Sequence, residues 1–193
     1  YFEIGIAEQN LIGIAAGLAS ENFDVITTTF APFQTLRCCE QIKVNLSYMK
    51  QKVIMIGLAS GLVQGPLGYT HCSIEDLSIT RSLPNLNVIS PADSFETTKA
   101  ISAALKSNLS SYIRLTGGTN NPIIYDKDYE FIIGKAVTIM EGKDIAIIST
   151  GTMVSESLKA YSELKKVNII PTVINIHTIK PNDKEKIIEV AKT

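Results

Sequence analysis

The sequence predicts an α/β protein in which a mostly parallel sheet carries helices on both faces. Apolar or β-branched runs alternate with longer helical segments along the chain, an order typical of parallel sheets with crossover helices. Residues 53–58 form a continuous apolar run, as expected for a strand buried on both faces. Apolar residues make up 45% of the 193 residues, which is enough to bury a sizeable core.

The first part of the chain accounts for most of this sheet. Small and apolar residues at 7–20 favour a helix, Val25 to Thr29 is β-branched, and Pro84 closes a helix that Ser73 opens with an acid three residues later, a variant of the capping box. We expect residues 1–5 to end a strand. The expected elements are helices at 7–20, 33–47, 73–83 and 94–107, and strands at 25–29, 53–58, 86–90 and 112–115.

A second, partial α/β unit follows a linker. Residues 116–128 are rich in Gly, Asn, Pro and Asp, as in connecting segments. Beyond them we expect strands at 132–140 and 144–149 joined by a turn at Glu141-Gly142, then a helix at 153–166, a strand at 170–176 and a helix from about 182. This predicts one domain at 1–130, lacking its first strand or strands, and part of another at 131–193. We expect the chain to be an internal fragment, because it opens on Tyr1 without a signal or transit pattern.

Composition excludes several classes of partner. The net charge of −1 argues against general binding to nucleic acid or anionic membranes, and no apolar run approaches the ~20 residues of a membrane span. Cys38, Cys39 and Cys72 have neither disulfide-framework nor metal-site spacing, so we expect buried, reduced thiols and no metal site. A reducing cytoplasm is the expected compartment.

Glu8 is the first candidate for chemistry. It stands at the start of an apolar helix, and nothing nearby in sequence is basic enough to pair with it. A carboxylate that enters a core without a partner must lose its charge or meet a ligand. The alternative is an acid placed favourably at a helix N-terminus.

Further candidates follow the expected strands, because ligands gather at the carboxyl ends of parallel strands. Phe30 and Phe33 lie at a strand-to-helix turn, and His71 ends the glycine-rich loop at 60–72, whose spacing matches no dinucleotide or P-loop motif. Arg114 stands in an apolar strand, so it is either an anion ligand or part of a structural salt bridge. His177, at the end of a second-unit strand, is expected to be structural.

The order of motifs resembles the transketolase family of thiamine-diphosphate enzymes. The motifs are GIAEQN with LIGIAAGLA, then TTFAPF, then GYTHCSIEDLSITRSLPNLNVISPAD, then SYIRLTGG. They are similar to that family's pyrimidine-binding domain. The segments IGKAVTIMEGKDIAIISTGTMVSESL and INIHTIKPND resemble the start of its carboxyl-terminal domain. The resemblance implies transfer of a two-carbon ketol unit between sugar phosphates.

The resemblance also implies roles for the candidates. Glu8 matches the glutamate that bonds the aminopyrimidine ring of the cofactor and so activates it. Phe30 and Phe33 match aromatic residues packed around that ring. His71 matches a histidine that binds substrate hydroxyls or moves protons, and Arg114 matches an arginine that holds substrate phosphate.

The rest of the site is expected on another domain. The family's GDG…N motif for Mg2+ and diphosphate is absent, so we expect both to be bound by a diphosphate-binding domain or a separate N-terminal subunit, in a homodimer or an α2β2 assembly. Leu67 and Ala59 stand where transketolases usually carry polar residues. The open alternatives are a 1-deoxyxylulose-5-phosphate synthase, a 2-oxoacid dehydrogenase E1 β-type subunit and a non-catalytic assembly subunit.

Overall fold

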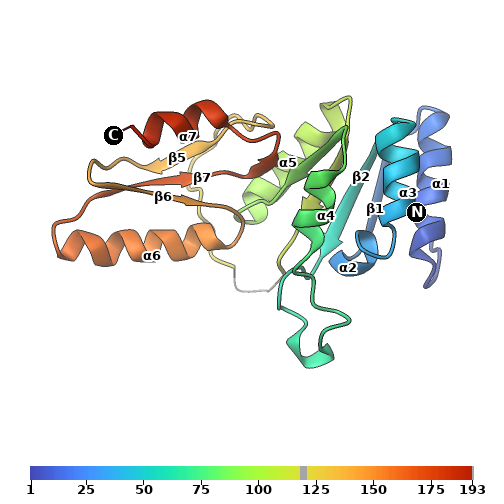
Figure 1. The fold of residues 1–193 in the computed structure, drawn as a ribbon, viewed down its shortest axis with the longest axis horizontal. Helices are drawn as coiled ribbons and strands as arrows, with labels where there is room; N and C mark the ends of the chain where they lie inside the picture. Colours follow the sequence, from blue (N-terminus) through green and yellow to red (C-terminus); the bar gives the residue numbers. More distant parts are fainter. Residues whose placement is uncertain (118–120, 193) are drawn as a thin grey trace.

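The protein consists of two α/β units side by side, the first around a five-stranded sheet and the second around a three-stranded sheet (Figure 1). The structure, a computed structural model, describes residues 1–117 and 121–192. The expected α/β fold with a mainly parallel sheet is confirmed. Across the described ranges, no helix has both the length and the apolar character that crossing a membrane requires.

The first sheet has the strand order β1-β2-β4-β3-β8. Its strands are β1 (Val25–Phe30), β2 (Val53–Leu58), β4 (Ser110–Arg114), β3 (Leu86–Ile89) and β8 (Thr178–Lys180). The first four run parallel, so their carboxyl ends meet at one edge, whereas β8 pairs antiparallel with β3. Strand β8 was not expected in this sheet, because its residues follow the linker and belong to the second part of the sequence.

Helices cover both faces of this sheet. The helical elements of the first unit are α1 (Glu8–Ser20), α2 (Ala31–Gln34), α3 (Cys39–Gln41), the π-helix η1 (Ile42–Tyr48), the 3₁₀ turn η2 (Gly65–Leu67), α4 (Asp76–Ser82) and α5 (Ser94–Lys106). Alternate residues of β2 serve the two faces: Val53 and Met55 pack under α1 and η1, while Ile54 packs under α5. Burial of β2 on both sides explains its uninterrupted apolar sequence.

Three local expectations were wrong. The helix expected at 33–47 is divided into α2, α3 and η1, with turns between α2 and α3. The capping box at Ser73 does not form, since α4 begins at Asp76 and its N-cap residue, Glu75, makes no side-chain capping hydrogen bond. Residues 1–5 form no strand.

The second unit has the strand order β5-β7-β6. Its elements are β5 (Val137–Met140), β6 (Ile145–Ser149), α6 (Met153–Lys166), β7 (Pro171–Asn175) and α7 (Lys184–Val190). Strands β5 and β6 are consecutive in sequence but do not pair, because β7 lies between them. The turn at Glu141-Gly142 therefore joins strands that are not neighbours in the sheet.

A buried carboxylate joins the two units. Glu96 of α5 is fully buried and accepts hydrogen bonds from the hydroxyls of Tyr125 and Tyr129 and from the Asn175 amide of β7. Burial raises the pKa of Glu96, and these hydrogen bonds oppose that shift. The expected linker carries Tyr125; its residues 118–120 lie outside the described residues, and the described remainder of 116–128 contains no helix or strand.

Candidate functional site

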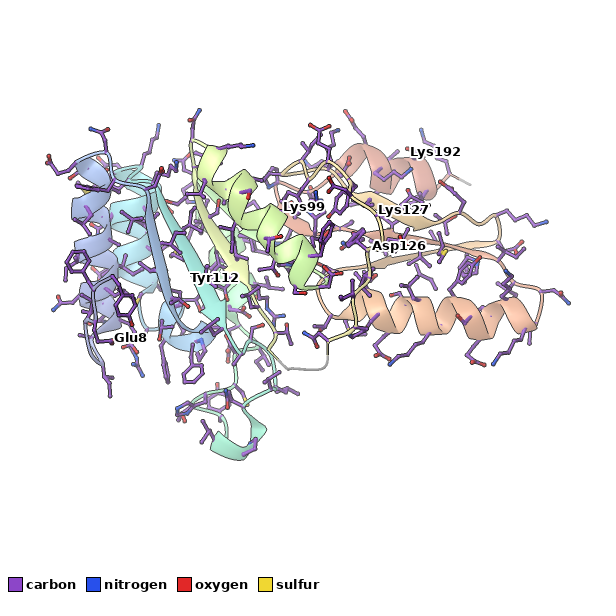
Figure 2. All side chains as sticks on the ribbon, turned by 180° about the vertical axis from the view of Figure 1, so that it is seen from behind. Glu8, Lys99, Tyr112, Asp126, Lys127 and Lys192 are labelled. Atoms are coloured by element: carbon purple, nitrogen blue, oxygen red, sulfur yellow. The ribbon has the colours of Figure 1, made fainter. Side chains whose placement is uncertain are left out.

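The candidate residues gather where the parallel strands of the first sheet end. From this edge the loop at 59–75 projects out of the unit, beside α2 (Figure 1). Figure 2 shows Glu8 at the end of α1 toward which this loop extends, and Tyr112 within the layer of strands. Elements far apart in sequence therefore bring their side chains to the same edge, as expected for a parallel sheet.

Glu8 is paired, contrary to the sequence expectation. Its Oε2 atom accepts a hydrogen bond from Arg37 Nη1 at 2.7 Å, and the side chains of Glu8 and Arg37 are 10% and 40% exposed. Arg37 follows α2 and lies 29 residues further along the chain, so inspection of Glu8's sequence neighbours could not find it. Glu8 opens α1, where the helix dipole also favours a negative charge.

An aromatic cluster lies beside this ion pair. The ring centroid of His71 is 5.2 Å from that of Phe33 and 6.1 Å from that of Phe30, and the two phenylalanine rings are 6.0 Å apart, all in edge-to-face arrangements. The Arg37 guanidinium carbon lies 3.8 Å from the centroid of Phe33. The structure thus brings Glu8, Phe30, Phe33 and His71 together through Arg37.

Two open cavities flank the ion pair. A cavity of about 490 Å³ is lined by Glu8, by most of β1 and by residues 1–5. One of about 290 Å³ is lined by Phe33, Arg37 and the loop residues Tyr69, Thr70 and Cys72. A larger cavity of about 870 Å³ lies between α5 and residues 128–133, away from every candidate residue. The site is therefore identified by its ion pair and aromatic cluster, not by the size of the cavity.

Arg114 belongs to a second polar group. Its Nε donates to Asp76 Oδ2 at 2.8 Å and its Nη1 to Thr116 Oγ1 at 3.1 Å, while Tyr112 also donates to Asp76 Oδ2. Asp76 is 1% exposed, so this is a buried salt bridge, one of the two alternatives for Arg114. The third guanidinium nitrogen, Nη2, makes only a long contact of 3.5 Å with the Ser73 carbonyl oxygen.

Other expected residues have clear positions. Ala59 is nearly buried just after β2 with a φ of 51°, and Leu67 is exposed on the projecting loop. Cys38 is buried, donates to the Phe33 carbonyl oxygen, and has its pKa raised to about 12 by burial, whereas Cys39 and Cys72 are half-buried. The described residues contain no group of three or more His, Cys, Asp or Glu side chains that could hold a metal ion.

Sequence reasoning missed Arg37 and Asp76. Arg37 is the single basic residue between Asp24 and Ile42, and it follows the two aromatics of the strand-to-helix turn. An isolated charge in such a segment is a usable signal. Asp76 was assigned to a helix start, and only the hydrogen bonds of the folded protein reveal that it faces Arg114 and Tyr112.

Comparison with known proteins gives a consistent result. The profile of the transketolase pyrimidine-binding domain matches residues 1–120, and that of the transketolase C-terminal domain matches residues 134–193. The chain is 38% identical over 189 residues to a 6-deoxy-6-sulfo-D-fructose transketolase subunit of Clostridium sp. (strain MSTE9), covering 98% of this chain and 58% of the relative.

Two further matches agree. The chain is 35% identical over 193 residues to an apulose-4-phosphate transketolase subunit of Phocaeicola vulgatus, covering 100% of this chain and 62% of the relative. Among solved structures, a split-gene transketolase in an inactive β4 tetramer superposes with a TM-score of 0.90 at 34% identity, covering 99% of this chain and 61% of that one. The chain therefore spans about three fifths of the length of these relatives.

Proposed function

Since the chain belongs to the transketolase family, we propose that it supplies the cofactor-activating half of a transketolase-like transferase. The enzyme moves a two-carbon ketol unit between sugar phosphates and uses thiamine diphosphate. The observation that carries this proposal is Glu8, a nearly buried carboxylate at a helix start with one oxygen bonded to Arg37 and an aromatic cluster beside it.

The residues present fit the pyrimidine end of the cofactor. A carboxylate beside aromatic faces suits a planar nitrogen heterocycle, because the rings pack against its faces while the carboxylate bonds its edge. Within the described residues, Glu8 Oε1 has no hydrogen-bond partner, so it is available for this contact. When bound, thiamine diphosphate supplies the carbon nucleophile that attacks a ketose carbonyl.

His71 and Arg114 serve the substrate in this proposal. His71 has one ring nitrogen near Thr70 Oγ1, at 3.0 Å, and its position at the end of the loop allows it to bond a substrate hydroxyl or move a proton. Arg114 offers its Nη2 atom to a substrate phosphate while Asp76 and Thr116 hold the rest of the guanidinium.

The remaining parts of the enzyme are assigned elsewhere. We propose that Mg2+ and the diphosphate group are bound by a diphosphate-binding domain or subunit, so that the working form is a homodimer or an α2β2 assembly in the cytoplasm. The split-gene relative, a β4 tetramer described as inactive, supports a requirement for a partner. We also propose that the domain boundary lies near residue 130, between the ranges that the two profiles match.

The test replaces Glu8 by Gln in the full-length protein assembled with its diphosphate-binding partner. Because Gln keeps the size of Glu but cannot share a proton, exchange of the cofactor's C2 proton should slow by at least ~100-fold, equivalent to about 2.7 kcal/mol. Proton NMR in deuterated buffer measures it. Glu21→Gln, an exposed change at the other end of α1, is the matched control and should leave exchange unchanged.

The same preparation separates the alternatives. Ketol transfer from a ketose phosphate to an aldose phosphate supports the proposal. Condensation of pyruvate with glyceraldehyde 3-phosphate would instead indicate a deoxyxylulose-phosphate synthase, and acyl transfer to a lipoyl group would indicate an oxoacid dehydrogenase subunit. A parental protein that binds cofactor without exchanging the C2 proton would be the non-catalytic assembly subunit.

A further inference from the structure

Arg37 connects three parts of the site that are distant in sequence. Its guanidinium bonds Glu8 at the start of α1 and covers one face of Phe33 in α2. The ring of His71 packs edge-to-face against the same Phe33 ring, with the centroids 5.2 Å apart. Arg37 therefore contacts both the carboxylate of Glu8 and the ring of Phe33.

The backbone of Arg37 is also held in place by hydrogen bonds. Its carbonyl oxygen accepts a hydrogen bond from Gln9 Nε2 at 3.1 Å, and its amide donates to the Pro32 carbonyl oxygen at 3.1 Å. The consecutive residues Glu8 and Gln9 thus hold the side chain and the backbone of the same arginine. This reciprocal attachment fixes the first turn of α1 relative to the segment that carries Phe33, which distinguishes Arg37 from a freely moving surface arginine.

The geometry restricts what Glu8 can do. Arg37 engages Oε2, while Oε1 has no hydrogen-bond partner among the described residues. A carboxylate that is 90% buried on its side chain and lacks this cation would turn toward water or lose its charge. Because Arg37 already engages Oε2, a ligand that reaches Glu8 would meet Oε1.

We propose that Arg37 is a positioning residue that acts through Glu8, a role that rests on the proposed function. It commits one carboxylate oxygen of Glu8, presents the other to a bound pyrimidine ring, and keeps Phe33 against that ring's site. The planar guanidinium suits this double task because it bonds a carboxylate along its edge and stacks on an aromatic ring with its face. A lysine ammonium provides the charge without the plane.

The test uses the full-length protein with its diphosphate-binding partner and four variants: Arg37→Met, Arg37→Lys, Glu8→Gln and the double variant Arg37→Met with Glu8→Gln. Methionine retains apolar contact with Phe33 but removes the charge. For each, we measure the dissociation constant for thiamine diphosphate in saturating Mg2+, the C2-proton exchange rate at saturating cofactor, and thermal unfolding without cofactor. Arg81→Met, an exposed change on α4, is the matched control.

Arg37→Met should weaken cofactor binding and slow exchange by ~10- to 100-fold, the range expected for loss of a charge-assisted hydrogen bond. Arg37→Lys should recover part of both. In the Glu8→Gln background, the Arg37→Met change should alter either quantity by less than about twofold, because an effect that passes through Glu8 disappears once Glu8 is neutral. A structural role alone would lower thermal stability equally in both backgrounds.

Three results would overturn the inference: parental binding and exchange in Arg37→Met, tighter cofactor binding in Arg37→Met, which would make Arg37 an obstacle, or an undiminished effect in the Glu8→Gln background. If Arg37→Met does not fold, Arg37→Lys decides, since parental values there would contradict a need for the planar fork. Failure of the proposed function is recognised separately, by parental exchange in Glu8→Gln alone.

Discussion

At the scale of single residues, Asp76 governs what Arg114 can do. Asp76 is almost fully buried and receives hydrogen bonds from Tyr112 and Arg114 through one oxygen, while its Oδ1 is buried without a partner in the described part of the chain. Burial, together with the charge of Asp76, raises the pKa of Tyr112 well above its usual value. Arg114 therefore compensates a buried charge in addition to any contact with substrate.

Removing Arg114 alone should destabilise the protein strongly. Arg114→Leu leaves the Asp76 carboxylate buried without its cation, so the free energy of unfolding should fall by about 3–5 kcal/mol. Adding Asp76→Asn should restore most of that loss, because the asparagine amide is neutral and its oxygen still accepts from Tyr112. Urea unfolding of the parent, Arg114→Leu, Asp76→Asn and the double variant measures this. Additive losses in the double variant would contradict the coupling.

The folded double variant then tests the phosphate contact. Relative to Asp76→Asn alone, loss of the arginine should lower kcat/KM for phosphorylated ketoses by ~10- to 100-fold and leave unphosphorylated ketoses nearly unchanged. Equal losses on both substrates would show that Arg114 supports the pocket without reading phosphate.

At the scale of elements, close packing between neighbouring strands decides where glycine is needed. Gly57 of β2 pairs with Arg114 of β4, and a Cβ atom at Gly57 would lie 2.5 Å from the Tyr112 hydroxyl oxygen. The hydroxyl is fixed by its bond to Asp76, so it cannot move without breaking that bond. The glycine therefore protects the geometry of the Asp76 group.

Gly57→Ala should displace the Tyr112 ring and lower the free energy of unfolding by about 1–3 kcal/mol, the usual effect of overpacking a core. Gly57→Ala combined with Tyr112→Phe should lose somewhat less than the sum of the two changes, because Phe removes the closest contact, that with the hydroxyl oxygen, while the ring atom Cε2 stays 2.7 Å from the added Cβ. The measurement is denaturant unfolding. If the losses of the two single variants simply add in the double variant, the strain does not arise from contact with the Tyr112 hydroxyl.

Elements with local causes could be predicted from sequence, and those with distant causes could not. The apolar run of β2 and the helical spacing of α1 are properties of consecutive residues, so both elements were predicted closely. The helix expected at 33–47 failed because Arg37 and Cys38 instead hydrogen-bond within a turn, and a π-helix follows. Strand β8 has only three residues, and its pairing partner β3 is about 90 residues away.

The candidate site shows the same division. Parallel strand order predicted that Phe30, Phe33 and His71 would lie at one edge, and they do. The partners of Glu8 and Arg114 were missed because both ion pairs join segments separated by 29 and 38 residues. Salt-bridge partners at such separations are set by the fold, which composition and spacing do not specify.

At the scale of the whole molecule, the two units share a buried junction. Glu96 reaches Asn175 of β7, and Ser90 at the end of β3 donates its amide to the carbonyl oxygen of His177. His177 is 1% exposed and its ring stacks on Phe131, with centroids 4.0 Å apart. Burial lowers the pKa of His177 to about 4, so this histidine is structural, as its position suggested.

Acid should therefore weaken the junction. The unfolded chain takes up the His177 proton near its ordinary pKa of about 6.5, whereas the folded chain takes it up only near 4. The stability from the neutral ring is present above pH ~6.5 and is lost as the pH falls through 4, up to about 3 kcal/mol. His177→Phe, which keeps the stack on Phe131, should remove this part of the pH dependence.

Urea unfolding at intervals between pH 7 and 4 checks this expectation, with His71→Asn as the control that replaces the less buried histidine. Parallel stability curves for the parent and His177→Phe would contradict it, since they would mean that His177 binds its proton equally well in the folded and unfolded chain.

The pairing of β8 with β3 also bears on how freely the two segments could be exchanged between relatives. In a chimera with its crossover near residue 130, β3 and β8 would come from different relatives. Residues 178–180 lie after the crossover, yet they form the edge strand of the first sheet. Glu96 and Asn175 would likewise come from different parents. The two segments are therefore poorly suited to exchange between relatives. A chimera that folds must take β3, Glu96, Asn175 and β8 from the same parent.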